Sequence, residues 1–74
     1  LTVKTLEGES FEISFDYKDD VLELKNKIHD IYGVSPDNQR LLYSGKQLED
    51  DKKLSDYNIN NKSIIYIVIR YRGG

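Results

Sequence analysis

Seventy-four residues and a mass of 8.6 kDa allow one domain, because a second one would be too short to bury its own hydrophobic core. The chain has no cysteine and one histidine, which excludes disulfides, thiolate metal clusters and a cysteine nucleophile. Basic and acidic residues are mixed along the chain and give a net charge of −2, so we expect neither a nucleic-acid-binding nor a membrane-binding surface. We therefore expect a soluble domain of intracellular type. We also expect it to be a monomer. Methionine is also absent, so we do not expect Leu1 to be the translated start.

The first fifteen residues predict an antiparallel hairpin. Residues 1–5 alternate apolar and polar side chains, which is the period of a half-buried strand. Gly8 lies in the turn that follows, where a positive φ is needed. Phe11, Ile13 and Phe15 then alternate with polar residues in a second strand, so a short glycine-containing loop joins two strands.

The spacing of apolar residues changes after residue 20 and predicts an amphipathic helix. The residues that recur at intervals of three and four are Val21, Leu24, Ile28 and Ile31. Asp20 is suited to the N-cap, and Glu23 three residues later completes a capping-box pattern. Gly33 is suited to the C-cap, and Pro36 prevents the helix from continuing.

The second half of the chain predicts three more strands, at residues 40–43, 46–48 and 64–71. Ser44-Gly45 forms a tight turn between the first two, and residues 54–57 form a short helical turn. This order favours an α+β fold of the β-grasp type, in which one helix packs across a mixed sheet of four to five strands and the last strand runs parallel to the first. The expected core consists of Val3, Ile13, Phe15, Val21, Leu24, Ile28, Leu41, Leu48, Leu54, Ile59, Ile65 and Ile67.

Several sequence blocks, in the same order and at the same spacing, resemble the ubiquitin family over the whole chain. The blocks are Val3-Lys4-Thr5-Leu6, Pro36-Asp37-Asn38-Gln39-Arg40-Leu41, Gly45-Lys46-Gln47-Leu48-Glu49-Asp50, Leu54-Ser55-Asp56-Tyr57-Asn58-Ile59 and Arg70-Tyr71-Arg72-Gly73-Gly74. The resemblance implies one ubiquitin-like domain over residues 1–74 with a flexible tail at about 70–74. It also implies a protein modifier of the cytoplasm and nucleus that is not an enzyme.

The resemblance implies that the tail carries the chemistry. In the family, the terminal carboxylate is adenylated with ATP, passed as a thioester between enzyme cysteines and joined to a lysine amine of a target protein. Gly74 is then the acyl donor, and Gly73 is the narrow stem that fits the enzyme channel. Arg70 and Arg72 are contacts for the partner enzymes. ATP is used by the activating enzyme, so we expect no cofactor on this chain.

Two signals disagree on which enzymes accept the chain. In the family, an arginine at the position of Arg70 marks ubiquitin, whereas the cullin-modifying relative has alanine there. The segment Tyr43-Ser44-Gly45-Lys46 resembles the cullin-modifying branch slightly more. We give more weight to Arg70 because this position bears directly on enzyme choice.

A hydrophobic patch matches the surface that ubiquitin-binding domains use in the family. Its residues are Leu6, Leu42, Gly45, Tyr66 and Val68. Strand alternation predicts the same exposure, because Ile65 and Ile67 facing inward place Tyr66 outward. Leu42 replaces isoleucine and Tyr66 replaces histidine, so the affinity for family receptors is open. Thr2 replaces an aromatic residue of a minor patch, so we expect weak binding to partners of that patch.

Four lysines match lysine positions of ubiquitin and are possible acceptors for chain growth: Lys4, Lys25, Lys27 and Lys46. Lys46 matches the position that is linked in proteasomal chains. The other three positions hold Glu9, Ile31 and Asn61, although Lys62 follows Asn61 directly. We expect Lys25 to be structural, with its stem packed at the helix and a carboxylate such as Asp50 nearby.

The implied partners are ubiquitin-activating, ubiquitin-conjugating and ligase enzymes, deubiquitinating proteases, ubiquitin-binding domains and target lysines. Two alternatives remain: a docking domain that is never conjugated, and a decoy that occupies ubiquitin enzymes. Neither the single histidine nor the acidic pairs have the spacing of a metal site, so we expect none, and we interpret His29 as a surface residue.

Overall fold

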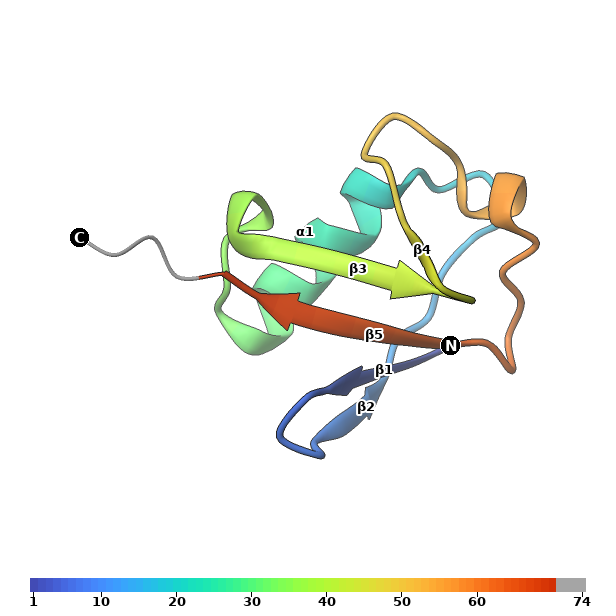
Figure 1. Ribbon diagram of the computed structural model, residues 1–74. Helices are drawn as coiled ribbons and strands as arrows, with labels where there is room; N and C mark the ends of the chain where they lie inside the picture. Colours follow the sequence, from blue (N-terminus) through green and yellow to red (C-terminus); the bar gives the residue numbers. More distant parts are fainter. Residues whose placement is uncertain (71–74) are drawn as a thin grey trace.

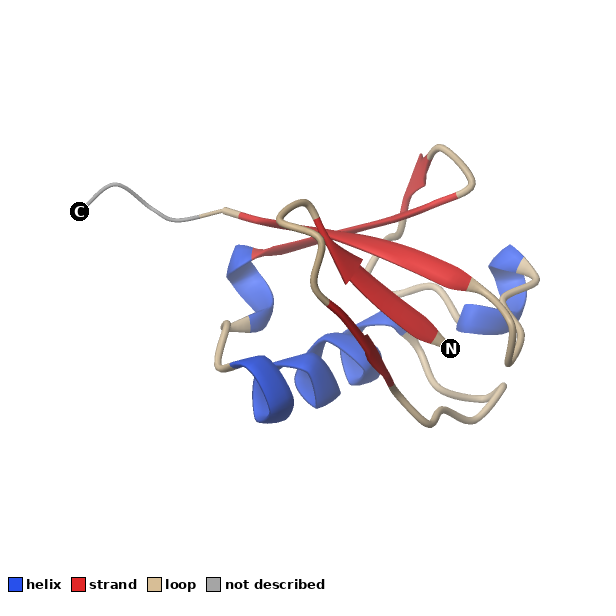
Figure 2. Ribbon diagram, turned by 90° about the horizontal axis from the view of Figure 1, so that it is seen from below, coloured by secondary structure: helices blue, strands red, loops and turns tan. Residues whose placement is uncertain are grey.

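A computed structural model describes residues 1–70 and contains one mixed sheet with a helix across one face (Figures 1 and 2). The strand order is β2-β1-β5-β3-β4. The strands are β1 (Thr2–Thr5), β2 (Ser10–Glu12), β3 (Gln39–Tyr43), β4 (Lys46–Gln47) and β5 (Ile64–Ile69). β1 and β5 are parallel and the other neighbours are antiparallel, which confirms the predicted β-grasp arrangement. Of the predicted tail, only Arg70 lies within the described residues.

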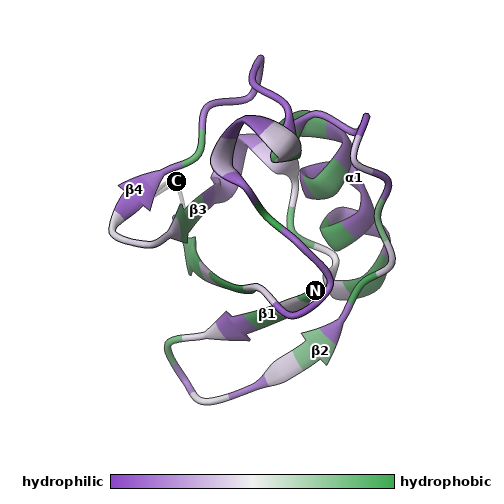
Figure 3. Ribbon diagram, turned by 90° about the vertical axis from the view of Figure 1, so that its right-hand side faces the viewer, coloured by the Kyte–Doolittle hydropathy of each residue, from purple (hydrophilic) through white to green (hydrophobic). Residues whose placement is uncertain are grey.

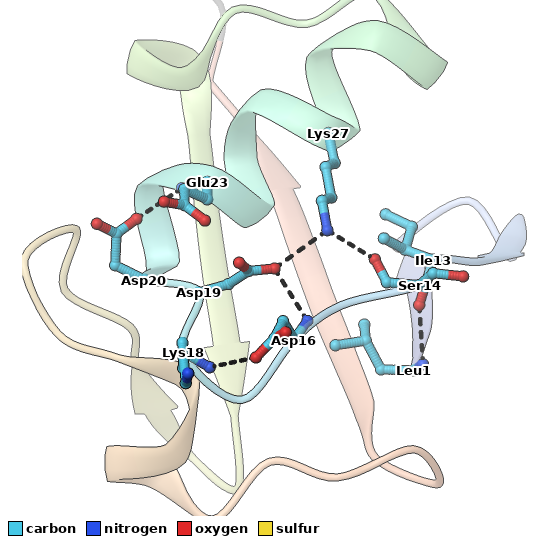
Figure 4. Close-up of polar contacts among 9 residues, drawn as sticks. All are labelled: Leu1, Ile13, Ser14, Asp16, Lys18, Asp19, Asp20, Glu23 and Lys27. Atoms are coloured by element: carbon cyan, nitrogen blue, oxygen red, sulfur yellow. Dashed lines mark hydrogen bonds and ion pairs between the residues drawn. The ribbon is translucent and has the colours of Figure 1, made fainter.

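Helix α1 (Val21–Tyr32) has the predicted caps. The Asp20 carboxylate accepts a 2.8 Å hydrogen bond from the Glu23 N–H (Figure 4), and Gly33, at a φ of 79°, donates its N–H to the His29 carbonyl. The reciprocal bond of a capping box is not formed between these residues, so the cap at Asp20 is one-sided. Local sequence thus determines where α1 begins and ends.

The buried face of α1 differs from the predicted one at its last turn. Val21, Leu24 and Ile28 are fully buried, but Ile31 is 57% exposed. Ile31 follows Ile28 by three residues, which corresponds to a rotation of about 300° around the helix axis. This rotation places Ile31 at the margin of the buried face. Tyr32 lies nearer its centre and packs against the core.

The core fills the space between α1 and the sheet, and hydrophobic residues recur along α1 between hydrophilic ones (Figure 3). Eleven of the twelve predicted core residues are buried. Phe15 is the exception: it is half-buried beyond the end of β2, with its ring edge-on to Tyr17 at 6.0 Å. The twelfth buried hydrophobic residue is Leu1, which was not among the predicted core residues. It is buried because it lies on the same side of the chain as Val3.

The second strand is shorter than predicted, but its partnership with the start of the chain continues past it. Ile13 and Leu1 exchange two backbone hydrogen bonds, of 2.9 and 3.0 Å. The predicted turn at Ser44-Gly45 is confirmed, with φ angles of 53° and 79°. Two successive positive φ values are typical of the tightest hairpin turns, so this turn fixes the register of β3 and β4.

Candidate functional site

The outer face of the sheet, away from α1, carries the central residues of the predicted patch. β5 supplies Tyr66, which is 47% exposed, and Val68, which is half-buried. In the neighbouring strand Leu42 pairs with Tyr66, and Arg40 pairs with Val68. Directly paired residues point to the same face, so Leu42, Tyr66 and Val68 form one apolar surface with Arg40 at its side. The outward orientation predicted from strand alternation is confirmed.

The ends of two hairpins complete this surface. Leu6 is 73% exposed in the turn after β1, and it lines the same shallow hollow as Val68. Gly45 lies in the turn after β3. The structure thus brings Leu6 beside Val68 and Leu42 beside Tyr66, while Gly45 marks the far end of β3. We call Leu6, Leu42, Gly45, Tyr66 and Val68 the outer patch.

One apolar residue of the same face was missed by sequence reasoning. Ile64 is 41% exposed and precedes Tyr66 by two positions on β5, so it lies on the same side of the strand. The alternation that placed Tyr66 outward could also have identified it. On β1, Thr2 pairs with Ile64 and Lys4 pairs with Tyr66. The outer patch therefore borders an apolar residue at one end and a lysine at its side.

The comparisons with known proteins assign this architecture. The family model described as "Ubiquitin family" matches residues 1–72. The chain belongs to the ubiquitin family. It is 39% identical to the ubiquitin-like protein NEDD8 of Dictyostelium discoideum, over all of this chain and 96% of that protein. It is 38% identical to ubiquitin-like protein 1 of Schizosaccharomyces pombe, over all of this chain and 95% of that protein.

Ubiquitin-like segments also match within much longer proteins. The chain is 41% identical, over 70 residues, to a segment of the large proline-rich protein bag6 of Xenopus tropicalis, and this match covers 6% of that protein. The relatives that match along nearly their full length are ubiquitin-like proteins. The family assignment therefore supports a ubiquitin-like modifier in general.

Two of the four lysines at ubiquitin lysine positions are held by other groups. Lys25 is 8% exposed, and its Nζ lies 2.6 Å from Asp50 Oδ1, which confirms the predicted contact. Lys27 Nζ donates to the Ser14 carbonyl at 2.9 Å and lies 3.1 Å from Asp19 Oδ2 (Figure 4). Both ammonium groups thus fasten α1 to neighbouring loops.

The other two lysines lie on strands and differ in their surroundings. Lys46 is exposed on β4, and Lys4 is half-buried on β1. Neither forms an ion pair within residues 1–70. Their amines are therefore the more accessible of the four.

The ubiquitin-like tail begins directly after β5. Arg70 is exposed, and its backbone N–H donates to the Asn38 carbonyl at 2.7 Å. This bond fixes the point from which the tail leaves the sheet. Arg72, Gly73 and Gly74 lie outside the described residues, so their predicted roles remain predictions.

A group of carboxylates precedes α1. The Asp16 N–H donates to Asp19 at 3.0 Å, and this bond, together with Glu23 and Lys27, holds the pKa of the Asp19 carboxyl below its usual value. The hydrogen bond with Asp19 in turn raises the pKa of Glu23. Within residues 1–70, no three histidine, aspartate or glutamate side chains are grouped to hold a metal ion. This group caps and anchors α1.

His29 is exposed on α1, as predicted for a surface residue. In the described part of the chain, no helix is long and apolar enough to cross a membrane.

Proposed function

We propose that this chain is a protein modifier that is joined through the Gly74 carboxylate to lysine amines of target proteins. The observation that carries the proposal is the family match over residues 1–72, in a chain whose next two residues are Gly73 and Gly74. Because β5 ends at Ile69, the glycines follow the folded domain after only a few residues. Gly74 is thus close enough to the domain for one enzyme to contact both.

The outer patch is the surface through which we propose that receptors recognise the modifier. Exposed apolar residues gathered on one face of a small domain favour a binding site. The Leu42–Tyr66 pair forms its centre, and Leu6 is the most exposed large apolar residue of the described chain. We propose that activating, conjugating and ligase enzymes, deubiquitinating proteases and ubiquitin-binding domains are the partners. The chain itself contributes no catalytic group or cofactor, and it acts in the cytoplasm and nucleus.

The first test is activation. The protein is incubated with ATP and the ubiquitin-activating enzyme, and in parallel with the NEDD8-activating enzyme. We expect a thiol-sensitive adduct with one of them that is absent for a variant lacking Gly74. The enzyme that responds identifies the pathway, which the opposing signals of Arg70 and the segment at 43–46 leave open. Absence of an adduct with both enzymes would contradict entry into either pathway.

A docking domain that is never conjugated is the second candidate. The match to a segment of a long bag6 protein favours it, since a ubiquitin-like domain is part of a larger chain there. The two candidates differ in their dependence on Gly74. A docking domain keeps its partner binding when Gly74 is removed and forms no thioester, whereas a modifier loses its covalent products. A decoy would form the thioester but would not support further chain growth on Lys46.

A further inference from the structure

Among residues 1–70, β2 forms one edge of the sheet and has β1 as its single neighbouring strand. Ile13 directs both of its backbone hydrogen bonds to Leu1. In an antiparallel ladder, successive residues turn their N–H and C=O groups to opposite sides. The backbone groups of Glu12, and of Ser10 two residues earlier, therefore point away from β1. An extended peptide could pair with them as an additional strand.

A groove runs between this edge and α1. It encloses about 370 Å³ and is lined by Glu12, Ile13, Ser14, Lys27, Asp30 and Ile31. Ile31 is the exposed isoleucine on the last turn of α1, and Ile13 is the buried residue opposite it. Apolar side chains of a bound peptide would cover Ile31, which the fold leaves in solvent.

The charges at the rim of the groove indicate what kind of peptide fits. Lys27 is bonded to the Ser14 carbonyl and paired with Asp19, so its charge is already compensated (Figure 4). Asp30 forms no ion pair within residues 1–70. The Glu12 carboxylate lies 3.9 Å from the Leu1 ammonium and accepts a hydrogen bond from the Thr2 hydroxyl, but its side chain is still 75% exposed. The remaining charge at the rim is therefore acidic and complements a basic ligand.

We propose that the edge of β2 and this groove bind an extended peptide in which apolar and basic residues alternate. Side chains of a strand alternate between its two faces. On one face the apolar residues pack against Ile13 and Ile31, and on the other the basic residues lie beside Glu12. A second copy of this chain fits less well, since pairing two β2 edges would bring two acidic rims together. The site lies on the α1 side of β2, separate from the outer patch, and does not depend on conjugation.

Fluorescence anisotropy tests the proposal with a labelled octapeptide of alternating valine and lysine. We expect Ile31→Lys to weaken its binding by about tenfold or more, because the substitution removes the apolar wall and adds a positive charge. Ile64→Lys is the matched control: it makes the same substitution at an exposed isoleucine on the outer face of the sheet. It should change the affinity by less than about twofold, since only the long-range charge effect remains. An octapeptide of alternating valine and glutamate should bind at least about tenfold more weakly.

Amide hydrogen exchange supplies a measurement that does not rely on substitutions. Strand addition should slow exchange of the Glu12 N–H, which points to the open edge, and should change that of the Phe11 N–H little. Equal binding to the Ile31→Lys variant, or peptide-induced NMR shifts centred on Leu42 and Tyr66, would overturn the proposal. So would equal binding of the glutamate peptide, formation of a dimer through β2, or absence of binding at about 1 mM peptide.

Discussion

The lysines of α1 and the lysines of the sheet match ubiquitin lysine positions equally well, yet their surroundings are opposite. Lys25 is buried against Asp50, and Lys27 contacts both Ser14 and Asp19 in the segment that precedes α1. Lys4 and Lys46 form no ion pair within residues 1–70. A shared position therefore does not tell whether an ammonium group holds the fold together or is free to react, because that depends on which carboxylates and carbonyls the fold brings to it.

The largest expected difference between the lysines of α1 and those of the sheet is in their contribution to the stability of the fold. Lys25→Ala should lower the free energy of unfolding by about 2–3 kcal/mol, because it removes a buried stem and leaves Asp50 without its partner. Lys46→Ala should change it by less than about 0.5 kcal/mol, since the side chain is exposed. Urea unfolding measures both. Lys25→Met, which keeps much of the stem, separates packing from charge. Equal stability of the two alanine variants would contradict the distinction between a lysine that stabilises the fold, such as Lys25, and an exposed one, such as Lys46.

The second difference concerns pH and the Lys27 bridge. Because the pKa of Asp19 is lowered in the folded state, its ionised form stabilises the fold above the pKa of the unfolded chain. This contribution is lost as the pH falls through the lower pKa of the folded state. Asp19→Asn should therefore cost about 1–2 kcal/mol at pH 7 and much less in strong acid. Thermal unfolding of both proteins across the acid range checks this, and a constant difference at every pH would contradict it.

The third difference is chemical and rests on the proposed function. If the modifier forms chains, new links should occur on Lys46 and Lys4 and be at least about tenfold rarer on Lys25, since an amine held in a salt bridge must first break it. Mass spectrometry of digested chains measures the links. Lys46→Arg, which keeps the charge, should remove the Lys46 link and leave the fold unchanged. Abundant links on Lys25 in the folded protein would contradict the expectation.

Short-range features were predictable from the sequence. Apolar spacing and the residues at Asp20 and Gly33 locate α1, because caps and helix faces depend on a few neighbouring residues. The turn at Ser44-Gly45 follows for the same reason. Phe15 was placed wrongly in the core because alternation continues beyond β2 in the sequence while regular pairing does not.

The outer patch and the groove differ in how much of each could be predicted from the sequence. Alternation along β5 places Tyr66 outward, so part of the patch is evident from one strand. The conjugation roles came from family resemblance alone. The groove combines Ile13 with Ile31 from two separate elements. Only the position of α1 against β2 brings those residues together, and no local pattern contains that information.

The parallel pairing of β1 with β5 has a consequence for how the chain folds. It joins the first residues to the last strand, so closing the sheet requires nearly the whole chain and a large loss of chain entropy. During synthesis β1 must wait for residues 64–69 to leave the ribosome. A chain cut short before Ile64 would lack both the central strand and everything after it. Under the proposed function, only a chain that has been synthesised past its last strand could carry Gly74 to an enzyme.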